Sequence, residues 1–187
     1  MQGLAGVLMS QGKFPDFEQV VSGLIAAQEC INGTEAAVTL MWRVRLAYAQ
    51  YSQSKYAEAI ATQEKALDIA RVGTGDDSRS LTADAYFGLA RYKLFARDFA
   101  GALAASEAGL ALAPKRLSLL AKQAEALLFL GRIPEAEKIY GEHRGQIEQE
   151  DQKRSWELLV TKNLDAIEKA GLTNPEFAKI RELLGSH

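Results

Sequence analysis

The spacing of two alanines constrains this 187-residue chain more than any other feature. Ala102 and Ala136 stand 34 residues apart (136 − 102), and each follows a turn and is followed by an apolar helical stretch. The flanking residues repeat as well, since residues 97–114 align with residues 131–145. A period of about 34 residues is typical of arrays of helix pairs, in which each pair buries its apolar face against the next. The spacing therefore predicts an all-α repeat architecture.

Two further copies of the pattern precede this one. Residues 54–70 place the equivalent alanine at Ala59, which is 43 residues before Ala102 (102 − 59). The nine extra residues (43 − 34) match the polar, glycine-containing stretch 72–80, which we interpret as an insertion between helix pairs. A weaker copy at residues 11–21 has the same order of turn, aromatic residue and helix. The chain is therefore expected to contain three clear repeats and one degenerate repeat at its start.

The best single repeat covers residues 83–114. Ala90 is small enough to let a second helix approach closely, and Ala102 is the matching small residue on that helix. Pro114 then ends the second helix, because proline lacks the backbone N–H and clashes with the preceding turn. This pattern resembles the tetratricopeptide repeat (TPR) family. The resemblance implies a right-handed superhelical α-solenoid built from antiparallel helix pairs.

We therefore expect residues 1–187 to form a single TPR-like domain. Residues 1–33 are expected to form a degenerate N-terminal helix pair, and residues 146–187 to form helices that cap the C-terminal end, because a stacked array exposes apolar surface at each end unless something covers it. The three clear repeats are expected at residues 34–72, 79–114 and 115–145.

Turn residues, helix stop signals and apolar periodicity together predict ten helices. Pro15 and Pro134 suit the first turns of two of them, and Gly131 and Gly171 suit helix ends. The predicted ranges are about 2–11, 15–30, 34–51, 55–71, 79–96, 99–112, 116–130, 134–144 and 149–170, followed by a last helix that opens at Asn174.

The second half of the chain carries a narrower resemblance. It is similar to TPR modules near the C-terminus of larger bacterial multidomain proteins. The similarity lies in the order of four segments, which are residues 94–114, residues 127–145, a helix with Trp156 and a final segment at residues 169–184. Some of those proteins contain caspase-like peptidase domains. No peptidase motif lies in these residues, so the resemblance transfers no catalytic residue to this chain.

Charge and hydropathy exclude several classes of partner. The formal net charge is −2, so nothing favours nucleic acid or anionic membrane, which both attract concentrated positive charge. No apolar run reaches the roughly 18 residues of a membrane span, and the N-terminus lacks the basic start of a signal peptide. The single cysteine, Cys30, has no partner for an internal disulfide, which is usual in a reducing compartment. We expect a cytoplasmic protein with neither nucleic acid nor membrane as its partner.

Residues suited to catalysis or metal binding are too few and too scattered to predict an enzyme. Nucleophilic catalysis by Cys30 would need a nearby histidine, and the two candidates, His143 and His187, lie far away in the sequence. We therefore expect Cys30 to be a buried structural thiol near a helix end. The stretch 73–78 lacks the spacing of a calcium or phosphate loop. The sequence predicts no enzyme, no metal and no cofactor.

The inner surface of the solenoid remains as the candidate functional site. Family geometry implies that the first helix of each pair lines a peptide-binding groove, with these residues facing it: Arg45, Tyr48, Phe87, Arg91, Lys122 and Glu125. Cationic and aromatic residues together suit an extended peptide with an acidic side chain or a free C-terminal carboxylate. The alternative is structural, with both aromatic rings in ordinary helix packing and both arginines paired with neighbouring carboxylates.

Two classes of function follow. The first is a non-catalytic interaction module or scaffold that binds a peptide or protein segment in the groove. The alternative is a small TPR chaperone of a bacterial secretion system, which would often self-associate, or a regulatory fragment of a larger effector protein.

Overall fold

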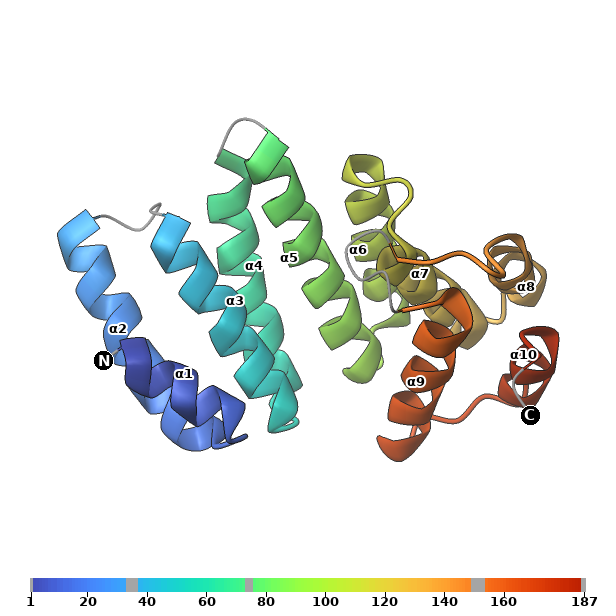
Figure 1. Ribbon diagram of the computed structural model, residues 1–187, viewed down its shortest axis with the longest axis horizontal. Helices are drawn as coiled ribbons and strands as arrows, with labels where there is room; N and C mark the ends of the chain where they lie inside the picture. The colour runs from blue at the N-terminus through green and yellow to red at the C-terminus, as the bar shows by residue number, and fades with distance from the viewer. Residues whose placement is uncertain (1, 33–36, 73–75, 149–153, 186–187) are drawn as a thin grey trace. The chain divides into compact units, whose positions relative to one another are not determined.

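The computed structural model describes residues 2–32, 37–72, 76–148 and 154–185 (Figure 1). In these residues every regular element is an α-helix, and the one β-type feature is an isolated antiparallel bridge between Ile147 and Ser155. The described helices are α1 (Gln2–Ser10), α2 (Phe14–Asn32), α3 (Ala37–Ser52), α4 (Tyr56–Val72), α5 (Asp76–Phe95), α6 (Phe99–Leu112), α7 (Leu117–Phe129), α8 (Ile133–Glu142), α9 (Trp156–Lys169) and α10 (Phe177–Leu183).

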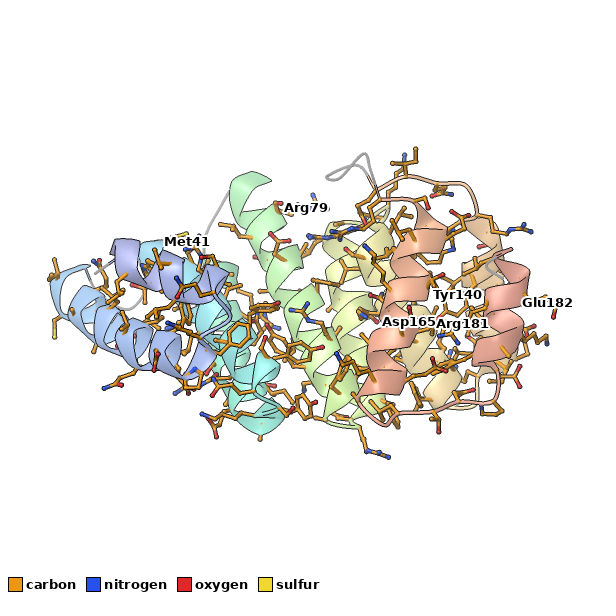
Figure 2. All side chains as sticks on the ribbon, turned by 60° about the horizontal axis from the view of Figure 1, so that its bottom comes forward. Met41, Arg79, Tyr140, Asp165, Arg181 and Glu182 are labelled. Atoms are coloured by element: carbon orange, nitrogen blue, oxygen red, sulfur yellow. The ribbon has the colours of Figure 1, made fainter. Side chains whose placement is uncertain are left out.

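The chain divides into two compact units, residues 1–92 and residues 93–187. Unit 1 contains α1 to α4 and most of α5, and unit 2 contains the end of α5 and the helices α6 to α10. Figure 2 draws the side chains of both, with Met41 labelled in unit 1 and Arg181 in unit 2. Each unit is described by itself below.

Several helix ends are fixed by nearby residues, and two of these, Gly131 and Gly171, were indicated by the sequence. The carboxylate of Asp98 accepts a hydrogen bond from the backbone N–H of Gly101 (2.9 Å) and caps α6. Gly131, at φ 74°, and Gly171, at φ 76°, adopt the left-handed conformation that follows a helix end. The range predicted for α6, residues 99–112, is confirmed.

The last two helices begin later than predicted. Helix α9 starts at Trp156, because Ser155 is extended in the bridge with Ile147 and caps the helix through Leu158 N (3.3 Å). The predicted start near residue 149 lies outside the described residues. Helix α10 starts at Phe177, because the Asn174 side chain accepts a hydrogen bond from Glu176 N (3.0 Å) and holds a turn there.

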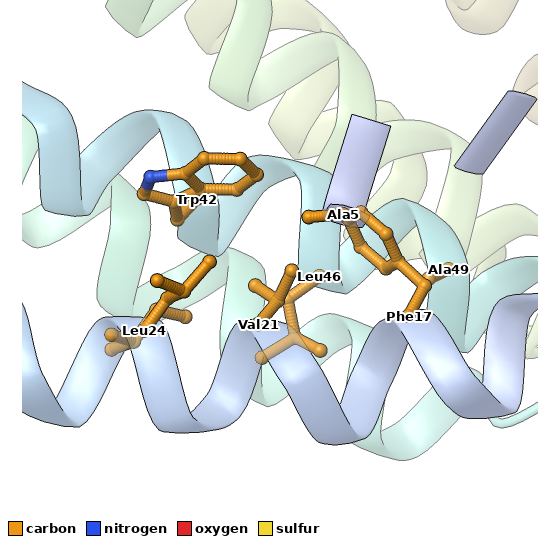
Figure 3. Close-up of a cluster of buried hydrophobic side chains, with 8 residues drawn as sticks. Ala5, Phe17, Val21, Leu24, Trp42, Leu46 and Ala49 are labelled. Atoms are coloured by element: carbon orange, nitrogen blue, oxygen red, sulfur yellow. The ribbon is translucent and has the colours of Figure 1, made fainter. Parts of the chain in front are cut away.

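The core of unit 1 forms where α2 lies against α3 and α1 (Figure 3). Phe17 and Val21 from α2 pack with Leu46 from α3, and the small side chains of Ala5 and Ala49 let the helices approach closely. Each large side chain that is fully buried contributes about 1.5–3 kcal/mol of stability. The weak N-terminal repeat therefore folds as a helix pair with a true apolar core.

Helices α4 and α5 are joined through a buried amide. Gln63 is fully buried and donates from Nε2 to the backbone carbonyl of Ala85 (2.9 Å). A Cβ at Gly88 would lie 3.2 Å from the same amide, so a larger residue there would require the Gln63 side chain to shift by a few tenths of an ångström. The sequence pattern had given no role to either residue.

Unit 2 is built around α7, which packs against α6, α8 and α9. Trp156 at the start of α9 is fully buried, and its indole Nε1 donates to the Tyr140 carbonyl on α8 (2.9 Å). Glu148, in the segment before α9, is also buried and caps α7 by accepting a hydrogen bond from Ser118 N (3.0 Å). This segment therefore connects α8 to α9 and also closes the N-terminal end of α7.

Helices α9 and α10 repeat the arrangement of the preceding pair. Helix α9 packs on α7 and α10 packs on α8, so first helix meets first helix and second meets second. Phe177 packs edge-on against Phe129 (5.9 Å between ring centroids), and Asn174 donates to the Leu128 carbonyl (3.0 Å). The start of α9 lies 39 residues after the start of α7 (156 − 117), five more than the repeat period. No described helix of either unit is both long enough and apolar enough to cross a membrane.

Candidate peptide-binding surface

The six residues predicted for the groove divide between the two units. Arg45, Tyr48, Phe87 and Arg91 lie in unit 1, on α3 and α5, and each is partly buried. Lys122 and Glu125 lie in unit 2 on α7. The four unit 1 residues and the two unit 2 residues are therefore considered separately.

Arg91 is surrounded by aromatic rings from its own unit. Its guanidinium carbon lies 4.8–5.4 Å from four ring centroids, those of Tyr48, Tyr51, Phe87 and Tyr92. Nη2 also donates a long hydrogen bond of 3.5 Å to the Tyr92 hydroxyl. A cation over an aromatic face gains about 0.5–1 kcal/mol at exposed sites and more where water is excluded. We name Arg91 and these four rings the Arg91 cluster.

The rings of the cluster also contact one another and a residue of α2. Tyr51 and Tyr92 lie 5.2 Å apart between centroids, and Phe14 meets Tyr48 edge-on at 6.1 Å. Tyr48 therefore contributes to helix packing, as the structural alternative expected, and it also lies against Arg91. The guanidinium of Arg91 is held in place by rings that are themselves fixed.

The arginines do not behave as the structural alternative expected. Arg45 lies over the Trp42 ring on its own helix, 5.0 Å from the ring centroid, and Arg91 lies in its cluster. In the part of the chain that the structure describes, neither arginine forms an ion pair with a carboxylate. The Nε of Arg91 is also buried without a hydrogen-bond partner there. Both guanidinium groups therefore lie against aromatic rings instead of against a described carboxylate.

Two tyrosines of the cluster, Tyr51 and Tyr92, remain neutral at physiological pH. Burial raises the pKa of Tyr51 to about 12, although the nearby charge of Arg91 acts in the opposite direction. Burial also raises the pKa of Tyr92, again against the effect of Arg91. Neither of these two phenols therefore neutralises the guanidinium.

In unit 2, Lys122 and Glu125 are buried instead of lining an open surface. Lys122 Nζ lies 2.6 Å from Glu125 Oε2, and Glu125 is fully buried. Asn163 on α9 donates from Nδ2 to the other carboxylate oxygen (2.8 Å). The packing of α9 on α7 therefore places both groups in a buried polar network. The two residues that were predicted to face the groove in the third repeat therefore help to hold α9 in place.

Tyr140 lies near this network and is fully buried. Its hydroxyl has no hydrogen-bond partner in the part of the chain that the structure describes. Burial, together with the negative charge of Glu125, raises the pKa of Tyr140 well above its ordinary value.

The expectation that Cys30 is a buried thiol is wrong. Cys30 is exposed, because it lies on the face of α2 opposite the core residues Phe17, Val21 and Leu24. His143 caps the C-terminal end of α8, and its ring lies 5.4 Å from the Trp156 ring. Among the described residues no three His, Cys, Asp or Glu side chains lie close enough together to hold a metal ion.

Sequence reasoning missed two members of the Arg91 cluster, Tyr51 and Tyr92. Tyr51 follows Tyr48 by three residues on α3 and Tyr92 follows Arg91 directly, so the aromatic enrichment was visible in the sequence. Their common contact with one guanidinium was not visible, because it depends on how α3 and α5 pack.

The fold and these contacts define the class of protein, an all-α solenoid of TPR type. Residues 35–115 match the family model described as "Tetratricopeptide repeat". Similar solved structures include crystal structures of nearly identical TPR-like repeats from a predicted kinesin light chain of Podosopora anserina. One of them is 18% identical to this chain, with a TM-score of 0.71, and covers 98% of this chain and 90% of that chain. A variant of that protein with a single substitution is also 18% identical, with a TM-score of 0.73, and covers 98% and 89%.

At this level of identity the structures establish the fold alone, and the predicted all-α TPR solenoid is confirmed. No curated protein matches the chain. The narrower resemblance of the second half to bacterial multidomain proteins stays a prediction.

Proposed function

We propose that this protein is a non-catalytic interaction module that binds an extended segment of a partner protein on the α3 and α5 surface of unit 1. Repeat proteins of this fold present long surfaces to partner segments. The observation that carries the proposal is the pair of arginines, Arg45 and Arg91, whose charges are balanced by aromatic rings and by no described carboxylate.

The chemistry of this surface favours a segment with an acidic side chain or a free C-terminal carboxylate. A guanidinium can donate two parallel hydrogen bonds to one carboxylate, which gives both strength and orientation. The chain as a whole has a net charge of −2, so an acidic partner needs locally positive groups such as these. Partly buried Tyr48 and Phe87 supply apolar contact area beside the charge.

The aromatic rings around Arg91 reduce the entropy cost of binding. A free arginine loses about 0.5–1.5 kcal/mol of conformational entropy when a partner immobilises it. The contacts of Arg91 with four rings restrict its side chain before any partner arrives. The binding surface is therefore partly preorganised.

An affinity pull-down from a lysate of the native host, analysed by mass spectrometry, tests the proposal. The wild type is compared with an Arg45→Glu/Arg91→Glu variant and with Lys65→Glu, a charge reversal at an exposed position of α4. We expect the partner to be retained by the wild type and by Lys65→Glu and to be lost with the double variant. All three proteins must give the same circular dichroism spectrum.

The same captured proteins with all three baits would contradict the proposed surface. A partner lost with Lys65→Glu as well would indicate attraction by total charge, which also contradicts it. Once a partner is found, a synthetic peptide with its acidic residue changed to the amide should bind at least about tenfold more weakly, which corresponds to about 1.4 kcal/mol.

A further inference from the structure

One side of α3 carries a row of residues at helical spacing that the core does not use. Met41, Arg45, Tyr48 and Ser52 are separated by four, three and four residues, so they lie along the same side of the helix. Met41, labelled in Figure 2, is 42% exposed, and the other three are partly buried. We name these four residues the α3 stripe.

The chemistry of the α3 stripe changes along the helix. Met41, near its N-terminal end, is a large apolar side chain that remains exposed. Arg45, one turn later, lies over the Trp42 ring and forms no ion pair with a carboxylate of the described residues. Tyr48, the next turn, contacts the Arg91 guanidinium (5.3 Å from ring centroid to guanidinium carbon). The stripe therefore presents an apolar group followed by two guanidinium groups.

Arg91 has donors that its own unit does not use. A guanidinium carries five N–H donors in a fixed plane. Within the described residues, Arg91 donates a long hydrogen bond of 3.5 Å to the Tyr92 hydroxyl, and its Nε has no partner. The surrounding rings fix the position of the group and leave its hydrogen bonding incomplete. A carboxylate is the group that matches such a donor set.

A carboxylate on α5 lies at the Met41 end of the stripe. Helix α4 runs antiparallel to both α3 and α5, so α3 and α5 run parallel. Asp84 precedes Arg91 by seven residues, just as Met41 precedes Tyr48. Because Tyr48 contacts Arg91, both Asp84 and Met41 lie about 10 Å from that contact, towards the N-terminal ends of their helices. An acidic group of a partner is therefore disfavoured beside Met41 and favoured at the other end.

The spacing of the stripe matches an extended chain. Arg45 lies about 6 Å from Met41 along α3, and the rings of Tyr48 and Tyr51, which contact Arg91, lie about 10 and 15 Å from it. Side chains on one side of an extended chain advance about 6.6 Å for two residues and about 13 Å for four. Alternate residues of an extended partner segment thus reach Met41, Arg45 and Arg91 in turn.

We propose that the partner segment carries an apolar side chain and two acidic side chains at alternate positions, with the apolar one at the end of the three. The apolar side chain contacts Met41, and the two carboxylates pair with Arg45 and Arg91. This inference rests on the function proposed above and adds to it an order and a spacing that acidic charge alone does not require. Met41 selects for the apolar side chain, and its flexible thioether adapts to different apolar shapes.

Titrations of the full chain with three fluorescent synthetic peptides test the proposal. Both peptide ends are blocked, so side chains supply every carboxylate. The apolar-end probe has leucine, glutamate and glutamate at alternate positions with serines between them. It is made in both chain directions, and the tighter of the two is used. In the acid-only probe serine replaces the leucine, and in the central probe the leucine lies between the two glutamates.

The wild type should bind the apolar-end probe about fivefold more tightly than the acid-only probe, because a half-exposed apolar contact becomes buried. Met41→Gln should bind these two probes equally, since glutamine has a similar length and helix propensity but no apolar end. Leu158→Gln is the matched control. Leu158 is also 42% exposed but lies on α9 of unit 2, so this variant should behave like the wild type.

The outcomes separate this inference from the proposed function. Equal binding of the apolar-end and acid-only probes to the wild type, with both lost in Arg45→Glu/Arg91→Glu, overturns the role of Met41 and leaves the proposed function standing. A central probe that binds as tightly as the apolar-end probe overturns the order. An equal loss with Leu158→Gln and Met41→Gln also contradicts the assignment. A wild type that binds no probe at millimolar concentration overturns the inference, while the pull-down still decides the proposed function.

Discussion

Two terminal helix pairs can be compared, α1–α2 in unit 1 and α9–α10 in unit 2. They pack in the same way but differ in the charge of their outward surfaces. Each buries an apolar stripe, with Phe17 at the centre of one and Trp156 at the centre of the other. The outward surface of α9–α10 is charged, and Arg181 pairs there with Asp165 (2.8 Å) and Glu168 (2.7 Å) (Figure 2). The exposed residues of α2 from Gln19 to Ile31 are uncharged, and Asp16 is exposed in the first turn of the same helix.

This contrast shows that two terminal helix pairs can bury similar apolar stripes and still differ in the charge of their outer surfaces. A terminal repeat needs a polar outer surface to stay soluble alone. The α9–α10 pair meets that condition with many exposed charges, and the α1–α2 pair carries fewer of them. The difference lies in the residues that each pair turns outward, since both pairs have well-packed inner faces.

The largest effect is expected when the buried aromatic residue of either pair is removed. Trp156→Ala and Phe17→Ala should each lower the free energy of unfolding of their own unit by about 3–5 kcal/mol, because a large cavity replaces a fully buried side chain. Denaturant titration with near-ultraviolet circular dichroism measures this loss. Equal small losses below about 1 kcal/mol would show that these pairs are not integral to the units.

The next test concerns the polar network that holds α9. Glu125→Ala should destabilise unit 2 by about 3–5 kcal/mol, because the buried Lys122 ammonium would lose the carboxylate that lies 2.6 Å from it. The double variant Lys122→Met/Glu125→Leu should be less destabilised, because apolar side chains then replace both members of this buried ion pair. Thermal unfolding distinguishes the two. A double variant as unstable as Glu125→Ala would contradict this account.

Alkaline pH should weaken unit 1 through the Arg91 cluster. The pKa of Tyr51 is about 12 in the folded protein, against an ordinary value of 10. Because the folded pKa is raised, the neutral phenol stabilises the fold fully below about pH 10, and this stability is lost as the pH rises towards 12. Tyr51→Phe, which cannot ionise, should make the fall in stability shallower over this range. Denaturant midpoints measured between about pH 9 and 12 give the slope, and an unchanged slope would contradict the assignment.

The smallest effect is expected at Gly23, on the exposed side of α2. Gly23→Ala should stabilise α2 by about 0.5–1 kcal/mol, because alanine has the better helix propensity and the added Cβ meets nothing. Gly141→Ala in α8 provides the same change in unit 2. Comparable gains at both sites, measured by thermal unfolding at low protein concentration, would confirm that the monomer leaves this face open. A loss at Gly23 alone would show that something already occupies the space.

The sequence predicted the helices well because their signals are local. Helix α6 was predicted residue for residue, and Asp98, Gly131 and Gly171 act at helix ends through contacts within a few residues. The starts of α9 and α10 were missed, because the bridge of Ile147 with Ser155 and the turn at Asn174 do not follow from helix propensity.

The candidate site was predicted in part. Placement of Arg45, Tyr48, Phe87 and Arg91 on the first helices α3 and α5 followed from the repeat period. The burial of Lys122 and Glu125 did not, because it depends on Asn163, which lies 38 residues after Glu125 and reaches it only when α9 packs on α7. The exposure of Cys30 was also missed, since a cysteine near a helix end gives no sign of the face on which it lies.

The sequence by itself determined that this protein is an all-α repeat protein, because a 34-residue period and helix stop signals are properties of the chain read in order. The tertiary structure decided which charges are available. It buried Lys122 against Glu125, surrounded Arg91 with four rings and left Cys30 exposed. The physical reason is that the local chain determines helix formation, whereas burial and charge pairing depend on residues that packing brings together from distant parts of the sequence.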